Sequence, residues 1–163
     1  MADAKDVIRA LGLEPLSVEG GFFKESYRSK TPSSQPGRCS GTCIYYLLSG
    51  TEISNWHKVA SDEIWLYHVG SPAQQILLFP DGSWAKRIIG PDIANGQVPQ
   101  SLIPAGAWQA ASLLDSSASS WGLFGAAVFP GFEYQDFTPG DATALAKAYP
   151  AAAESMKAAK LLG

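Results

Sequence analysis

The chain has 163 residues, of which 46% are hydrophobic and 17% charged, and its formal net charge is -3. This length suits a single domain over residues 1–163, and its scattered Lys and Arg argue against a nucleic-acid partner, because neutralising phosphates requires clustered positive charge. No stretch reaches the ~20 apolar residues of a membrane span, and the acidic N-terminus does not resemble a signal peptide. We therefore expect a cytoplasmic protein with no membrane partner.

Helices are predicted only near the two ends of the chain. Asp3 is placed to cap a first helix, and Gly12 is placed to end it. Ala, Leu and Lys dominate from residue 141 onward and predict two helices separated by Pro150. Short hydrophobic segments separated by Gly, Pro, Asn and Asp turns fill the middle of the chain. The predicted parts are an N-terminal helix (1–14), an all-β sandwich or barrel (15–140) and C-terminal helices (141–163).

Two segments of the β-rich part alternate clearly. In the first, strict alternation over residues 22–28 places Lys24 and Arg28 on one face and Glu25 on the other. That basic face would either hold an anionic ligand or be an ordinary solvated strand face, and both interpretations stay open. The second segment, residues 132–137, predicts a further strand.

The stretch from Ser54 to Gly70 holds both histidines of the chain, His57 and His68, together with Glu63 and two of its tryptophans. A histidine and a carboxylate on neighbouring strands, surrounded by aromatic residues, are typical of the polar floor of a pocket. Alternation from Glu63 directs residues 63, 65 and 67 to one side of the strand and His68 to the other.

The spacing of these residues resembles the cupin pattern. Gly50 is followed by six residues, His57-x-Val59, three residues, Glu63, six residues and Gly70, and a later segment reads Pro104-x-Gly-x-x-Gln109. Val59 and Gln109 stand at two of the four usual metal positions, where the pattern has histidines.

Further segments are similar to one subgroup, the Cupin_5 family, whose function is unknown. They include Glu19-Gly-Gly-x-Phe-x-Glu-x-Tyr-Arg-Ser29, Ile44-Tyr-Tyr-Leu-Leu48, Asp62-Glu-Ile-Trp65, Gly90-Pro-Asp92 and Pro130-Gly-Phe-x-Tyr-x-Asp-Phe137. The family often has a histidine at the position of Leu66. The resemblance implies a cupin double-stranded β-helix (jelly-roll barrel), a homodimer and kinship in fold with sugar-nucleotide epimerases, but no known reaction.

Three functions follow as hypotheses. The first is binding of a small molecule, a nucleotide, sugar nucleotide or related sugar, on the basis of fold analogy and the basic strand face. The alternative is a metal-independent epimerase or isomerase with His57 as general base and Glu63 as its partner, since imidazole titrates near neutral pH. A structural or storage role is the third.

The candidate site has catalytic and ligand-binding members. His57 and Glu63 are the candidate catalytic residues. No metal ligand and no cofactor is assigned because too few histidines converge, although weak binding of a divalent metal at His57 and Glu63 stays open. The ligand-binding candidates are polar, charged or aromatic residues expected near the pocket: Lys24, Glu25, Arg28, Trp56, Trp65, Tyr67, Gln109 and Tyr134.

Overall fold

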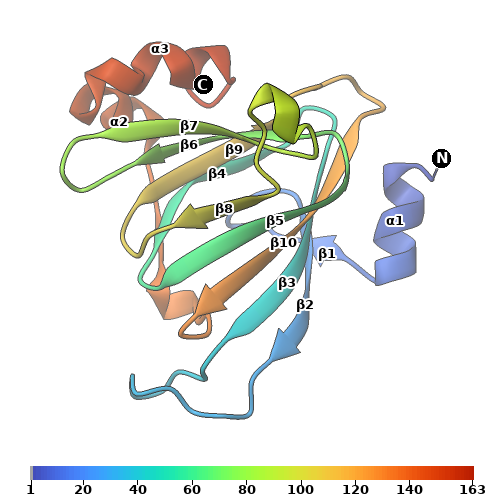
Figure 1. Cartoon of the computed structure of the whole chain (residues 1–163), viewed down its shortest axis with the longest axis vertical. Helices are drawn as coiled ribbons and strands as arrows, with labels where there is room; N and C mark the ends of the chain where they lie inside the picture. The colour runs from blue at the N-terminus through green and yellow to red at the C-terminus, as the bar shows by residue number, and fades with distance from the viewer. Residues whose placement is uncertain (1) are drawn as a thin grey trace.

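Two antiparallel β-sheets pack face to face in the computed structural model, which describes residues 2–163 (Figure 1). The strands are β1 (Glu14–Pro15), β2 (Phe22–Arg28), β3 (Thr42–Ser49), β4 (Ile53–Val59), β5 (Asp62–Gly70), β6 (Ala73–Leu78), β7 (Trp84–Ile89), β8 (Gln100–Ile103), β9 (Trp108–Leu113), β10 (Trp121–Phe129) and β11 (Phe137–Pro139). The helices are α1 (Ala4–Leu11), α2 (Ala142–Ala148) and α3 (Ala153–Ala158), with 3-10 turns η1 (Ile93–Asn95), η2 (Tyr134–Asp136) and η3 (Pro150–Ala152).

The strand order is β1-β2-β3-β10-β5-β8 in the larger sheet and β11-β4-β9-β6-β7 in the smaller one. Neighbours in each sheet are mostly distant in sequence, as in a jelly roll, so the two sheets close into a barrel. This arrangement confirms the predicted all-β jelly-roll fold with short helices near both ends. Among residues 2–163, no helix is long and apolar enough to cross a membrane.

Large side chains fill only part of the space between the sheets. Tyr46, Trp65 and Phe124 are each at most 1% exposed and contact one another through their rings. The smaller Ile44 and Ala126 lie on the same inward faces, two residues away from Tyr46 on β3 and from Phe124 on β10. The aromatic core therefore fills one part of the barrel and leaves room for a cavity beside it.

Helix α1 covers the outside of the larger sheet. Its N-cap is Asp3, whose side chain accepts a hydrogen bond from the Asp6 amide at 2.8 Å, and its C-cap is Gly12 with φ 63°. Both ends match the sequence prediction, because a carboxylate satisfies a free amide at the start and only glycine adopts positive φ without strain at the end. The helix packs on Leu47 and Leu123.

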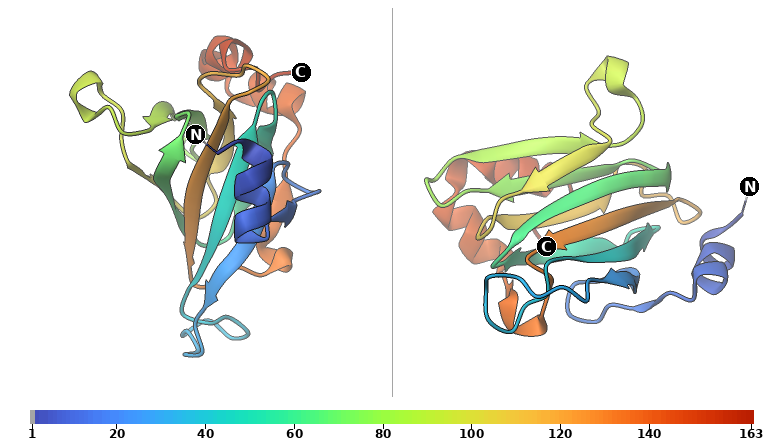
Figure 2. Two further views of the ribbon diagram at one scale, coloured as in Figure 1. Left: turned by 90° about the vertical axis from the view of Figure 1, so that its right-hand side faces the viewer. Right: turned by 60° about the horizontal axis from the view of Figure 1, so that its bottom comes forward.

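Helices α2 and α3 cover the outside of the smaller sheet (Figures 1 and 2). Pro150 separates them, as predicted, and it also starts η3. Met156 and Leu161 are buried against Ile76 and Leu78, while the indole of Trp56 donates a hydrogen bond to the Leu161 carbonyl at 2.8 Å. The C-terminal segment is thus a structural part of the barrel wall.

The prediction of a strand over residues 132–137 is wrong for most of the segment, because Tyr134–Asp136 form the 3-10 turn η2 and only Phe137 belongs to a strand, β11. Glu133 and Asp136 make a reciprocal capping box, which satisfies amides that a strand would have directed to a neighbour. Arg38 also donates to both oxygens of Asp136, at 2.7 and 2.6 Å, and both side chains are buried. The turn is therefore fixed by a residue far away in sequence, which alternation cannot reveal.

The packing of α3 predicts a large loss of stability on truncation of Met156. We expect Met156→Ala to lower the free energy of unfolding by about 2–5 kcal/mol, because it leaves a cavity in a fully buried cluster. Lys157→Ala on the exposed side of the same helix should change it by less than about 0.5 kcal/mol. Urea denaturation measures both, and equal effects would show that α3 is not anchored by this cluster.

Candidate functional site

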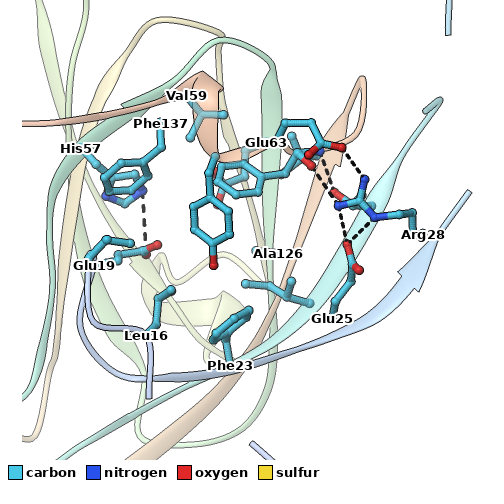
Figure 3. Close-up of a pocket in the computed structure, with 17 residues that line it drawn as sticks. Leu16, Glu19, Phe23, Glu25, Arg28, His57, Val59, Glu63, Ala126 and Phe137 are labelled. Atoms are coloured by element: carbon cyan, nitrogen blue, oxygen red, sulfur yellow. Dashed lines mark hydrogen bonds and ion pairs between the residues drawn. The ribbon is translucent and has the colours of Figure 1, made fainter. Parts of the chain in front are cut away.

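A cavity of about 320 Å³ opens at one end of the barrel (Figure 3). Its walls are mostly apolar and come from both sheets, including Phe23, Ile44, Val59, Ala126 and Phe137. Polar side chains gather at two places. In Figure 3, His57 and Glu19 face each other on one side of the cavity, whereas Arg28 and Glu25 lie on the other.

His57 on β4 is held in one orientation. Its ring is 2% exposed and stacks on Phe137 with the ring centroids 5.1 Å apart. Nδ1 lies 2.7 Å from the Asn55 carbonyl oxygen, and because a carbonyl only accepts, Nδ1 carries the proton. In its neutral form the ring therefore has its lone pair on Nε2, which lies 3.8 Å from Oε1 of Glu19, and in its protonated form the same atom carries an N–H facing this carboxylate.

Glu63 on β5 is buried, with 6% of its surface exposed. Its two carboxylate oxygens accept hydrogen bonds from the Trp65 indole at 2.8 Å and from the Gln109 amide at 3.0 Å. Burial raises the pKa of Glu63, while nearby His57 and the two N–H donors act in the opposite direction. The carboxyl group is thus fixed in position and shifted toward the protonated form.

Glu19 lies beside His57 at the floor of the cavity, and the sequence did not lead us to assign it to the site. The two glycines after it adopt φ 101° and 71°, and a Cβ on Gly20 would clash with the Ile53 carbonyl oxygen. This close approach turns the chain so that Oε1 of Glu19 accepts a hydrogen bond from Ser54 at 2.7 Å. The signal was the Glu-Gly-Gly motif, which contributed only to the family resemblance.

Arg28 lies at the rim and is already paired. It contacts Glu25 and Glu133, each at 2.8 Å, and donates to the Phe132 carbonyl at 3.0 Å. The hydrogen bond from Arg28 to Glu25 is the largest cause of the raised pKa of the guanidinium. One cation between two carboxylates leaves the rim with a net negative charge.

The expected basic face of Lys24 and Arg28 is wrong. A β-bulge between Glu25 and Tyr27 shifts the register of β2 against β3, so Glu25 and Arg28 both line the cavity. Lys24 points to the outer face, where its Nζ would lie 3.2 Å from a Cβ on Gly12. A bulge inserts one extra residue and reverses the alternation beyond it.

The remaining candidates lie around the cavity rather than all within it. Tyr134 is 61% exposed at the mouth, and Trp65 and Gln109 stand behind Glu63 as its hydrogen-bond donors. Trp56 faces the C-terminal helices, away from the cavity. Tyr67 bonds to the Gly70 carbonyl at 2.7 Å and lines a separate depression.

His68 lies on the outer face of the larger sheet, as alternation predicted. Its ring contacts Tyr45 edge to face with the centroids 6.3 Å apart. Only His57 of the two histidines therefore reaches the cavity, and the floor consists of His57, Glu19 and Glu63.

Comparison with known proteins identifies the family. Residues 5–139 match the family model described as Cupin_5, Cupin superfamily (DUF985). The chain belongs to the Cupin_5 family. The uncharacterized protein YML079W of Saccharomyces cerevisiae is 34% identical over 135 residues, which cover 74% of this chain and 67% of the yeast protein.

Solved structures agree with this assignment. Protein SO0799 from Shewanella oneidensis is 34% identical, with a TM-score of 0.86 over 100% of this chain and 98% of that one. A hypothetical protein from Leishmania major is 27% identical, with a TM-score of 0.82 over 92% and 94% of the two chains. Oxalate decarboxylase from Bacillus subtilis is 14% identical, with a TM-score of 0.56 over 89% of this chain and 36% of that one, and shares the fold alone.

The residues of this Cupin_5 chain do not fit the usual cupin metal centre. At two of the four ligand positions stand Val59, an apolar wall residue, and Gln109, whose amide nitrogen donates to Glu63. Within residues 2–163, no three His, Cys, Asp or Glu side chains are grouped as a metal site would require. Weak binding of a divalent cation at His57 and Glu63 stays a prediction.

The raised pKa of Glu63 predicts a pH-dependent contribution to stability. The folded state binds this proton more tightly than an unfolded chain, where the pKa is about 4.3. The contribution therefore favours folding below about pH 4.3 and is lost as the pH rises through the higher folded pKa. Glu63→Gln removes the titrating group. The free energy of unfolding of the variant, measured relative to that of the wild type, should therefore increase as the pH rises across this window.

Urea denaturation between pH 4 and 8 measures the difference between the two proteins. An amide in place of the Glu63 carboxylate has one acceptor oxygen and cannot accept from both Trp65 and Gln109 in the same way. The variant therefore also carries a constant offset, and the pH dependence of the difference is the informative quantity. A constant difference would contradict the prediction.

Proposed function

We propose that this protein binds a small molecule in the barrel cavity. The observation that supports this most is the polar floor formed by Glu19, His57 and Glu63 in an otherwise apolar enclosure. Buried polar groups are costly unless they are hydrogen-bonded, and Nε2 of His57 lies beyond hydrogen-bond distance from Glu19. A ligand with N–H or O–H groups would supply the missing partners.

The ligand class we favour is a sugar, or the sugar or nucleoside part of a nucleotide or sugar nucleotide. Hydroxyl and amide groups of such a ligand would donate to the carboxylates of the floor, and its flat faces would pack on Phe23 and Phe137. A phosphate at the rim would meet Arg28 already paired with two carboxylates. The uncharged part of the ligand is therefore the part that the cavity suits.

A thermal-shift screen of sugars, nucleosides, nucleotides and sugar nucleotides tests this proposal. We expect a ligand that binds the folded state to raise Tm, since a concentration of 100 times Kd adds about 2.7 kcal/mol of stability. Ala126→Phe fills the cavity and should abolish the shift, whereas Ala127→Phe, on the outer face of the same strand, should retain it. Null shifts at millimolar ligand, or equal shifts in both variants, would refute cavity binding.

Proton transfer is a second candidate function, which two features of the floor favour. Nδ1 of His57 is held as a donor by a backbone carbonyl, so Nε2 is available as a base. Burial raises the pKa of Glu63, which suits a group that donates a proton. Together they would move a proton from carbon beside a carbonyl group and return one to the product, as an epimerase or isomerase does.

Exchange in deuterated water tests the isomerase candidate. With a ligand from the screen, the wild type should incorporate deuterium at carbon, and His57→Ala should lower the rate by about 100-fold or more. The control is His68→Ala, which removes the histidine on the outer face and should leave the rate unchanged. Equal incorporation by the two variants, or none by the wild type, would eliminate this candidate.

A further inference from the structure

Two buried glutamine side chains each keep one atom without a hydrogen-bond partner. Gln75 on β6 is 0% exposed and Gln109 on β9 is 1% exposed. Within residues 2–163, Nε2 of Gln75 and Oε1 of Gln109 are the two such buried side-chain atoms. One is a donor and the other an acceptor, and leaving either unpaired in the interior is unfavourable.

The sheet register places the two amides near each other. Strands β6 and β9 are antiparallel neighbours in which Leu77 pairs with Gln109 and Gln75 pairs with Ala111. Gln75 and Gln109 are thus diagonal neighbours, and their bonds to β8 and β5 of the opposite sheet show that both point into the barrel. Diagonal neighbours are about 7–8 Å apart at the backbone, which is within reach of long side chains, so the two amides can both contact one shared water.

The other polar atom of each amide does have a hydrogen-bond partner. These hydrogen bonds lead away from the two amides in opposite directions. On one side, Arg87 donates to the Ser101 hydroxyl at 3.0 Å, and that hydroxyl donates to Oε1 of Gln75 at 2.6 Å. On the other side, Gln109 donates to Glu63 at 3.0 Å. All these donors point the same way, from a guanidinium toward a carboxylate.

We propose that one buried water joins Gln75 to Gln109 and makes Arg87 a positioning residue for Glu63. The water accepts from Nε2 of Gln75 and donates to Oε1 of Gln109. In donor order the completed chain runs Arg87, Ser101, Gln75, water, Gln109, Glu63. Hydrogen bonds in such a chain polarise one another, so the positive end stabilises the ionised carboxylate at the other end.

The other charged and titratable groups around Glu63 come from different elements. His57 faces it from β4, Glu19 from the segment before β2 and Tyr46 from β3. Changes at Arg87 or Gln75 leave these three groups in place. A change in the ionisation of Glu63 in Gln75→Leu, which keeps the charge of Arg87, therefore reports on the hydrogen-bond chain rather than on the loss of a charge.

The indole N–H of Trp65 is a direct reporter, because it donates to Glu63. In 15N–1H spectra of the ligand-free protein recorded against pH, its shift should follow the ionisation of Glu63. The indole of Trp56, bonded to the Leu161 carbonyl, is an internal control that should not follow it.

Arg87→Met and Gln75→Leu interrupt the chain at different points. Each should move the Trp65 midpoint upward by about 0.5 pH unit, less than the 1–3 units caused by a charge next to the titrating group. Arg87→Lys keeps a positive charge, so its midpoint should lie between those of the wild type and Arg87→Met. Lys86→Met removes the same charge from an exposed position on the same strand and should move the midpoint by less than 0.1 unit, roughly the shift expected from a screened surface charge. Equal midpoints in Arg87→Met and Lys86→Met would overturn the proposal.

A high-resolution crystal structure tests the water itself. We expect a solvent peak within hydrogen-bond distance of both amides, and its loss in Gln75→Leu. A direct amide–amide contact, or no peak, would overturn the bridging water. The inference builds on the proposed function only in taking Glu63 as a floor residue. Both measurements use the ligand-free protein, so a null ligand screen leaves them standing, and their failure leaves ligand binding standing.

Discussion

The structure depends on how the barrel accommodates the carboxylate of Glu63. A buried carboxylate is costly without hydrogen bonds, and here the donors come from both sheets, Trp65 on β5 and Gln109 on β9. This arrangement requires the inward faces of the two sheets to be in register, and it places Glu63 beside His57, which pairs with Gln109 across β4 and β9. The same bonds that satisfy the carboxylate therefore fix the floor of the cavity.

In the proposed binding role, the floor and the rim would contact different parts of a ligand. The floor offers two carboxylates and an imidazole nitrogen inside apolar walls, where hydrogen bonds to a ligand are stronger than in water. The rim carries Arg28 between Glu25 and Glu133, so its positive charge is already neutralised. This contrast favours uncharged, hydroxyl-rich groups inside the cavity over phosphate at its mouth, and the same geometry serves either binding or proton transfer.

Sequence patterns predicted the fold more completely than the site. Turn residues and terminal caps such as Asp3 and Gly12 act locally, so the order of elements followed from neighbouring residues. The placement of Lys24 failed because a bulge in β2 reverses the alternation, and bulges leave little trace in composition. Trp56 adjoins His57 but faces the C-terminal helices, since both sides of β4 are buried. The role of Glu19 depends on a backbone approach between distant segments, which no local pattern shows.

The location of the binding site is best tested by a crystal structure of the protein with the tightest-binding compound from the ligand screen. We expect density for that compound within the cavity, with a donor group hydrogen-bonded to Glu63 or Glu19 and a polar atom near Nε2 of His57. A compound bound on the outer face of either sheet, with the cavity free of it, would show that this floor is not the recognition site.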